Sequence, residues 1–203
     1  MRKYYDTIIL AECVKENYEL LNNKYDGVTG SDVYSDFKES KSVPDWFRQY
    51  IPYARSLDNF NQKKVYEIGH LAAYYDAKKS ESNYMFDRWI FTTIIRLNFA
   101  DKIPYEKTVE QILNLTIMPD LILILSASEQ LIKERAILRD NNFDFNQEFY
   151  NYENNVFSTL KKDKRFVIIN NEGNIIDTFE TIDNVLSNKN IIEKGRVLKY
   201  EDK

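Results

Sequence analysis

A charged pair, Asp87–Arg88, ends an apolar run and precedes a segment with a helical pattern of apolar residues. The run is Tyr84–Phe86, and Ile90, Ile94 and Leu97 share one face of the predicted helix. Open α/β sheets place their ligand groups where a strand ends and a helix begins. The pair therefore has two interpretations: a ligand site, or a salt bridge on the protein surface.

Arginine side chains recur in the highly charged segment 128–140, which predicts another helix. Arg135 and Arg139 are four residues apart and so share a helical face. One interpretation is a solvated helix face with ion pairs such as that between Glu129 and Lys133. The other, contact with phosphate, is what the family resemblance described below implies.

The elements that must position these groups alternate between strands and helices. Besides the run that ends at Asp87, strands are predicted at Tyr25–Thr29, Leu121–Leu125 and Arg165–Asn170. Leu121–Leu125 is wholly apolar and bounded by polar residues, which is typical of a parallel strand covered on both faces. We expect one α/β domain, residues 1–187, with a parallel sheet of about five strands, helices on both faces and a polar tail at 188–203.

Apolar stripes at helical spacing predict the intervening helices. They are Val65, Ile68, Ala72 and Tyr75; Val109, Ile112 and Leu113; Phe145, Phe149, Tyr152, Val156 and Leu160; and Phe179, Ile182 and Leu186. The aromatic segment 42–58 predicts short helices and loops over the sheet. We expect Trp46, Phe47 and Tyr53 to pack in the core rather than to stack on a base, and His70 to be structural.

The N-terminal region has two interpretations. One is a helix over residues 7–23, where Leu10, Val14, Tyr18 and Leu21 repeat at helical spacing and Asp6 is a plausible N-cap. Alternatively, the β-branched residues Thr7–Ile9 make Tyr4–Leu10 a short buried strand.

The composition excludes several classes of protein. No apolar run is long enough to span a membrane, and the N-terminus lacks the apolar region of a signal peptide. A net charge of −4 makes nucleic acid an unexpected partner. The single cysteine, Cys13, fits a reducing compartment, so we expect a cytoplasmic protein without a membrane partner. With one histidine and one cysteine, Mg²⁺ is a more plausible metal than a transition metal.

Two segments together resemble a known family. FDRWIFTT followed by PDLILILSASEQLIKERAILR is similar to the thymidylate kinase group of P-loop nucleoside monophosphate kinases, especially its short viral forms. In that family an apolar strand ends in Asp-Arg, with a hydroxyl residue four positions after the arginine, and Asp87, Arg88 and Thr92 fit. A Pro-Asp-Leu strand, here Pro119–Leu121, and a lid helix with an arginine, here Arg135, come later.

The resemblance covers about residues 7–187 and implies a role for each charged group. Arg88 would hold the acceptor phosphate, and Asp87 would organise phosphates, Mg²⁺ or the acceptor oxygen. Arg135 and Arg139 would close over the phosphates of ATP. The implied activity is transfer of the γ-phosphate of Mg·ATP to a deoxynucleoside monophosphate, which is catalysed mainly by positioning and cationic stabilisation. The apparent relatives commonly form dimers.

Further substrate contacts follow from the same resemblance. Ser31 and Asp32 lie after the predicted strand Tyr25–Thr29, where the family has its acceptor loop; a plain turn is the alternative. Thr92 and Arg96 lie one helical turn apart. Arg96 occupies the place where the family usually has a tyrosine for the base or sugar, so recognition of the base departs from the family pattern.

The phosphate-binding loop of the family is missing. No G-x-x-x-x-G-K-[ST] sequence occurs, and Asp6–Ile9 occupies its place. These residues supply no lysine and few flexible N–H donors, and Asp6 would repel phosphate. Two functions therefore stay open: a nucleotide kinase that uses Mg²⁺ and ATP, or an inactive pseudo-kinase that binds a nucleotide or a protein partner.

The missing loop also raises a question of topology, because the family's first strand is the middle of the sheet. Either Tyr4–Leu10 is that strand, or the sheet is rearranged, or a partner fills the place, or the chain is a fragment. Frequent Asn, Lys, Ile and Tyr suggest an AT-rich genome and a viral source, hence a host cytoplasm.

Overall fold

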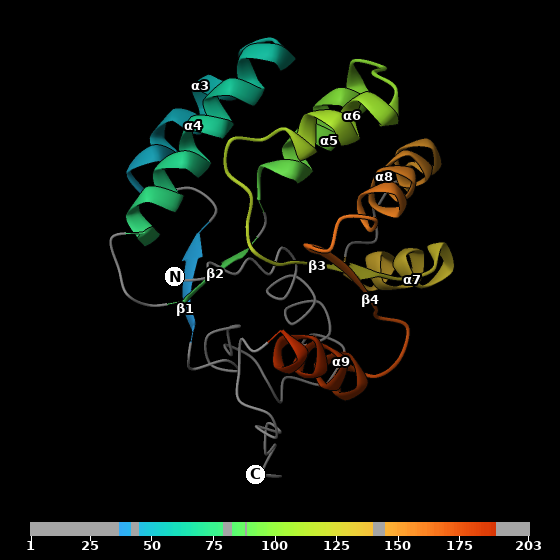
Figure 1. Ribbon diagram of the computed structural model, residues 1–203. Coiled ribbons are helices and arrows are strands. Elements are labelled where there is room, and N and C mark those ends of the chain that lie inside the picture. Colours follow the sequence, from blue (N-terminus) through green and yellow to red (C-terminus); the bar gives the residue numbers. More distant parts are fainter. Residues whose placement is uncertain (1–36, 42–44, 79–82, 88, 140–144, 190–203) are drawn as a thin grey trace.

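Strand β2, Asn83–Asp87, and helix α5, Ile90–Ala100, lie where the sequence predicts a strand and a helix (Figure 1). Ile90, Ile94 and Leu97 are all buried, so the predicted apolar face of α5 is the face that packs on the core. The structure is a computed structural model. It describes residues 37–41, 45–78, 83–87, 89–139 and 145–189.

The other elements follow an alternating order that the sequence largely predicts. They are β1 Phe37–Lys41, η1 Asp45–Tyr50, α3 Ile51–Arg55, α4 Asn59–Lys78, α6 Tyr105–Leu113, β3 Ile122–Ser126, α7 Glu129–Arg139, α8 Gln147–Leu160, β4 Phe166–Asn170 and α9 Ile175–Asn188. The short helices η1 and α3 confirm the prediction for segment 42–58. Strand β1 was not predicted, because its sequence, FKESK, is mostly polar. The predictions for Tyr4–Leu10 and Tyr25–Thr29 lie outside the described residues.

The described strands form two parallel pairs. β1 pairs with β2, from Phe37 opposite Asn83 to Lys41 opposite Asp87. β3 pairs with β4 in the same parallel sense. Figure 1 shows the strands in the order β1, β2, β3, β4 across the picture. The parallel pairing predicted for Leu121–Leu125 is confirmed, and the protein is mixed α/β with more helix than strand.

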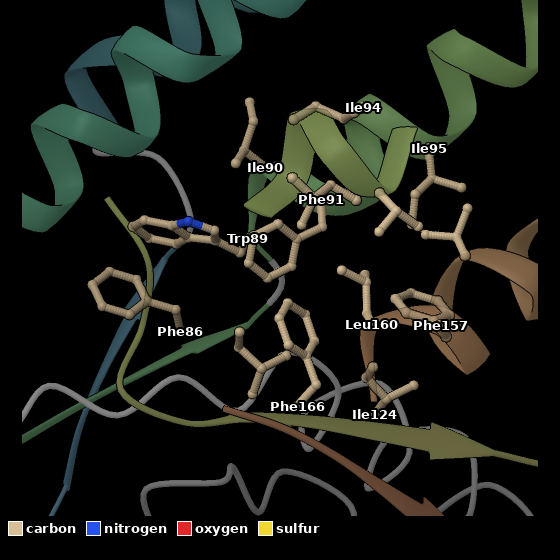
Figure 2. Close-up of a cluster of buried hydrophobic side chains, with 14 of the residues drawn as sticks. Phe86, Trp89, Ile90, Phe91, Ile94, Ile95, Ile124, Phe157, Leu160 and Phe166 are labelled. Carbon is tan, nitrogen blue, oxygen red and sulfur yellow. The ribbon is translucent and has the colours of Figure 1, made fainter. Parts of the chain in front are cut away.

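One hydrophobic cluster joins the two pairs of strands. Phe86 of β2, Ile122 of β3 and Phe166 of β4 all belong to it, together with residues of α4, α5, α6 and α8 (Figure 2). Phe91 of α5 reaches Phe166 with ring centroids 5.7 Å apart. Fully burying a side chain of this size stabilises the fold by roughly 1.5–3 kcal/mol. Both pairs therefore pack against the same core, to which α5 also contributes.

Helices cover both sides of the strands. In Figure 1, α4, α5, α6 and α8 lie on one side and α9 lies on the other. Leu121–Ile124 is accordingly buried throughout, as its unbroken apolar sequence predicts. Phe179, Ile182 and Leu186 of α9 are buried as well, which confirms the predicted closing helix. Among the described residues, no helix is long and apolar enough to cross a membrane.

A buried polar network fastens α4, α5, α6 and α8 to one another. The Asn98 amide donates hydrogen bonds to Thr108 Oγ1 (2.9 Å) and Gln111 Oε1 (3.0 Å), and its oxygen accepts one from Lys63 Nζ (2.7 Å). The hydroxyls of Thr108 and Tyr152 are 2.6 Å apart. A buried polar group without a partner costs about 1–3 kcal/mol, so these bonds fix how the four helices meet.

The apolar stripe that predicts α4 does not coincide with its buried face. Ile68 and Tyr75 are exposed, whereas His70 and Ala73 of the same helix are buried against the core. Helix α4 thus carries apolar side chains on two faces, and its spacing pattern alone identifies the helix but not the face that packs.

The expectation that the aromatic side chains of segment 42–58 pack in the core is partly wrong. Phe47 is buried, as expected, but Trp46 and Tyr53 are exposed on η1 and α3. These helices are short and pack on α4 through small and polar groups; Gln62 of α4 donates a hydrogen bond to the backbone oxygen of Ala54. The large rings therefore stay on the outer side.

Lys102 has a left-handed backbone with φ of 56°, in the turn that ends α5. Because only glycine adopts this conformation without steric cost, Lys102→Gly should raise the free energy of unfolding by about 1 kcal/mol. Lys102→Val should lower it, since a β-branched residue is worse there. Lys102→Ala is the matched control for loss of the charge. Urea unfolding measures all three, and equal effects of Gly and Ala would contradict the assigned backbone.

Candidate functional site

The carboxyl end of β2 is the place to which the sequence assigns a phosphate group. Asp87 is the last residue of β2 and lies opposite Lys41 of β1. Trp89 then takes an extended conformation (φ −128°, ψ 176°), and α5 begins at Ile90. The end of a strand and the N-terminus of a helix are therefore close in the chain, which is the arrangement that open α/β sheets use for ligands. Arg88 itself lies outside the described residues.

Trp89, the residue before α5, is buried in the core. Its ring is buried and meets Phe86 edge-on, with centroids 5.0 Å apart, and His70 of α4, 5.2 Å away. Its indole nitrogen is buried and has no hydrogen-bond partner among the residues described. The packing of the ring is strong enough to outweigh that cost of about 1–3 kcal/mol. Trp89 therefore fixes the backbone on the C-terminal side of the Asp87–Arg88 pair.

His70 is held as a neutral side chain. Its Nδ1 donates a hydrogen bond to the backbone oxygen of Tyr66 at 2.7 Å. Burial, only partly opposed by this bond, lowers the pKa of His70 from its ordinary 6.5 to about 4. The prediction that His70 is structural agrees with this environment.

Thr92 lies in the first turn of α5 and is half-buried. Its hydroxyl donates to the backbone oxygen of Trp89 at 3.2 Å, which leaves the oxygen lone pairs able to accept a further hydrogen bond. Arg96 lies one turn further along α5 and is exposed. The two side chains share a helical face, with Thr92 nearer the end of β2.

A second polar group gathers at the carboxyl ends of β3 and β4. The backbone N–H of Ser128, just before α7, donates to the Glu172 carboxylate at 3.0 Å. Asn171 donates its backbone N–H to Ser126 (2.8 Å), and its side chain accepts a hydrogen bond from Thr178 (3.0 Å). Glu172 therefore places a negative charge at the N-terminal end of α7, where a bound anion would otherwise be favoured.

Arg135 is tied to this second group. Its guanidinium donates to the backbone oxygen of Asn171 at 3.0 Å, and the side chain is half-buried. Arg139 is the last residue of α7, and its side chain lies outside the described residues. In this conformation Arg135 joins α7 to the segment after β4.

The i,i+4 pair predicted on α7 is present. Lys133 Nζ lies 2.5 Å from Glu129 and 4.5 Å from the centroid of the Phe145 ring. The hydrogen bond from Lys133, followed by that from Gln147, holds the pKa of Glu129 below its ordinary value. Lys133 and Glu129 neutralise one another. The phosphate-binding interpretation of Arg135 and Arg139 stays a prediction.

The predicted site residues thus fall into three sets. Asp87, Thr92 and Arg96 lie along the β2–α5 junction, and Arg135 and Arg139 lie on α7. Ser31, Asp32 and Arg88 lie outside the described residues. Within the described ranges, no three His, Cys, Asp or Glu side chains gather as metal ligands.

Sequence reasoning missed Asn171 and Glu172. The sequence pattern that identified Asp87 would also have identified these two, because both are polar residues directly after an apolar strand, here β4.

The burial of His70 predicts an acid-sensitive stability. Below pH 6.5 the unfolded chain binds a proton at this histidine, whereas the folded protein resists it down to about pH 4. Stability should therefore fall with pH across this interval, and the two pKa values correspond to a loss of roughly 3 kcal/mol. A His70→Leu variant should lack this component. Urea unfolding across the interval compares the slopes, and identical slopes would contradict a buried neutral His70.

Comparison with known proteins finds no matching family model and no matching curated protein. The likeness to nucleoside monophosphate kinases accordingly rests on residues of this chain alone. Of those, Asp87 ends β2 shortly before α5 begins, and Lys133 of α7 is paired with Glu129.

Proposed function

We propose that this protein binds a nucleoside monophosphate at the carboxyl end of β2, through Arg88, Thr92 and Asp87. The observation that carries the proposal is the junction itself, in which β2 ends at Asp87 and α5 begins at Ile90. A helix N-terminus directs N–H groups at an anion, and an arginine fork adds two parallel hydrogen bonds. Thr92 offers a further polar contact in the first turn.

The monophosphate is the preferred ligand because the residues proposed to hold it are better supported than those proposed to hold ATP. Asp87 suits an acceptor hydroxyl or Mg²⁺, and Mg²⁺ bound there would take most of its ligands from phosphates and water. When bound, Mg·ATP would supply the transferable phosphate. Arg135 and Arg139 are the residues on α7 that would contact its phosphates, with Arg135 first leaving Asn171.

A second candidate is a pseudo-kinase that binds the nucleotide without turnover. Two observations favour it: the chain has no phosphate-binding loop, and Glu172 places a carboxylate at the N-terminus of α7. Loss of a single transition-state donor costs roughly 3–4 kcal/mol, so loss of the loop would slow phosphoryl transfer by many orders of magnitude. Such a protein would act in the cytoplasm, the host's if the source is viral, by sequestering nucleotide or engaging a protein partner.

The fold that accompanies this function is a five-stranded parallel sheet, with Tyr4–Leu10 as the strand between β2 and β3. Among the described residues, β2 pairs with β1 and β3 pairs with β4, and both pairs pack on one core. A sheet loses two rows of backbone hydrogen bonds if a central strand is missing. The β-branched run Thr7–Ile9 suits a buried strand.

Calorimetry with thymidine monophosphate and the other deoxynucleoside monophosphates tests the proposed site. Arg88→Ala should weaken binding about tenfold or more, because a charge-assisted bidentate contact contributes about 1.5–3 kcal/mol. Arg55→Ala, an exposed arginine on α3, is the matched control and should leave the affinity unchanged. Binding that both variants retain would show that Arg88 is not the phosphate ligand.

The same samples, with Mg·ATP added, separate the two candidates. ADP formation that depends on the monophosphate and is lost in Arg88→Ala supports a kinase. Binding without ADP formation supports the pseudo-kinase. Absence of both binding and turnover with every monophosphate would contradict the proposed function.

Nuclear magnetic resonance tests the fifth strand. Residues Thr7–Ile9 should have strand-type chemical shifts and interstrand contacts from their amides to backbone protons of β2 and β3. Helical shifts in Leu10–Leu21 would be compatible with this result. Helical shifts at Thr7–Ile9, or no contact with either strand, would contradict the proposed sheet.

A further inference from the structure

The orientation of the Trp89 indole is set by packing alone. Its nitrogen is buried and has no hydrogen-bond partner among the residues that the structure describes. The ring of Phe86 packs against it from β2 (Figure 2), and the ring of His70 packs against it from α4. A buried donor without a partner gains a hydrogen bond if it can turn toward water. Loss of a neighbouring ring would therefore allow the indole to change its orientation.

His70 is itself held by a hydrogen bond, in addition to packing. Its Nδ1 donates to the backbone oxygen of Tyr66, one turn earlier on α4, at 2.7 Å. This bond fixes the rotation of the imidazole, which an apolar side chain at the same position could not do. The imidazole therefore meets the Trp89 indole in a defined way, with ring centroids 5.2 Å apart and an angle of 81° between the ring planes.

The backbone of Trp89 in turn holds the first turn of α5. Trp89 is the N-cap residue of this helix, and its side chain makes no capping hydrogen bond. Its backbone oxygen accepts hydrogen bonds from the hydroxyl of Thr92 at 3.2 Å and from the backbone N–H of Thr92 at 3.4 Å. The position of Trp89 therefore determines where the Thr92 hydroxyl lies.

The contact of His70 acts on one end of α5 only, because α4 holds the other end separately. Asn98, near the C-terminus of α5, accepts a hydrogen bond from Lys63 at 2.7 Å. The same lysine lies 3.5 Å from Asp101, the C-cap residue of α5. Loss of the His70 ring would therefore release the first turn of α5 and leave the last turn attached to α4.

We propose that His70 is a positioning residue for the first turn of α5, acting through Trp89. The inference rests on the proposed function, in which this turn contributes Thr92 to a monophosphate site. His70 is buried and would not touch the nucleotide. Residues behind a binding group hold it in the geometry that binding requires, so their loss lowers affinity without removal of any ligand contact. If His70 only filled the core, its loss would lower stability and leave the affinity unchanged.

Fluorescence tests the hold of His70 on Trp89 without any ligand. The chain has two tryptophans, so Trp46→Phe leaves Trp89 as the only one. In this background His70→Ala should move the emission to longer wavelength and increase quenching by acrylamide, because the indole can then reach water. His70→Phe keeps a ring beside the indole and should restore most of the original emission. Leu186→Ala, which removes a buried side chain from α9, is the matched control and should change neither.

Calorimetry with thymidine monophosphate tests the effect on the site. His70→Ala should weaken binding about tenfold, because a binding group must be held to within about 0.5 Å of its productive position. His70→Phe should recover most of this loss, and Leu186→Ala should leave the affinity unchanged although it destabilises the fold. In a Thr92→Val background His70→Ala should have a smaller effect, because the contact through which it acts is already lost.

The two measurements separate failure of this inference from failure of the proposed function. Unchanged Trp89 emission in His70→Ala would overturn the inference whether or not a nucleotide binds. A changed emission with the affinity of the wild type would also overturn it. A wild-type chain that binds no monophosphate contradicts the proposed function instead. The emission, together with the backbone amide shifts of Ile90–Thr92 in His70→Ala, then decides whether His70 positions this turn.

Discussion

The packing of α5 on the core that both pairs of strands share is the contact on which the rest of the structure depends. At its N-terminal end Trp89 meets Phe86 of β2, and in the first turn of the helix Phe91 meets Phe166 of β4. The Asn98 network fastens the other end to α4, α6 and α8. Displacement of α5 would therefore disturb both pairs of strands and the helical layer above them. The proposed phosphate site shares this position, because the first turn of α5 follows directly from β2.

The N-termini of helices α5 and α7 have different surroundings. The N-terminus of α5 is held by buried apolar rings, and its N-cap residue, Trp89, makes no side-chain capping bond. The N-terminus of α7 receives the Glu172 carboxylate, and its arginine bonds to the chain after β4. An anion at the N-terminus of α7 would compete with the Glu172 carboxylate. That contact is the reason for proposing monophosphate binding rather than phosphoryl transfer.

Much of the fold could be predicted from local patterns that one physical effect dominates. Leu121–Leu125 is apolar because β3 is covered on both faces, and the stripe of α9 matches its buried face. Prediction failed where the pattern was mixed. Strand β1 could not be recognised, because its sequence is mostly polar and the strand depends on pairing with β2. The buried face of α4 could not be identified, because this helix carries apolar residues on two faces. Buried Asn98 could not be anticipated, because its partners come from two other helices, α4 and α6.

Thymidine monophosphate titrated into isotope-labelled protein, with backbone amide shifts recorded at each step, tests the central claim most directly. A phosphate bound at the carboxyl end of β2 should shift the amides of Asp87–Thr92 and leave those of Asp101–Ile103, at the other end of α5, unchanged. Saturable shifts confined to the first group are the predicted result. Shifts confined to the second group, or no shift at saturating nucleotide, would contradict a nucleotide site at the β2–α5 junction.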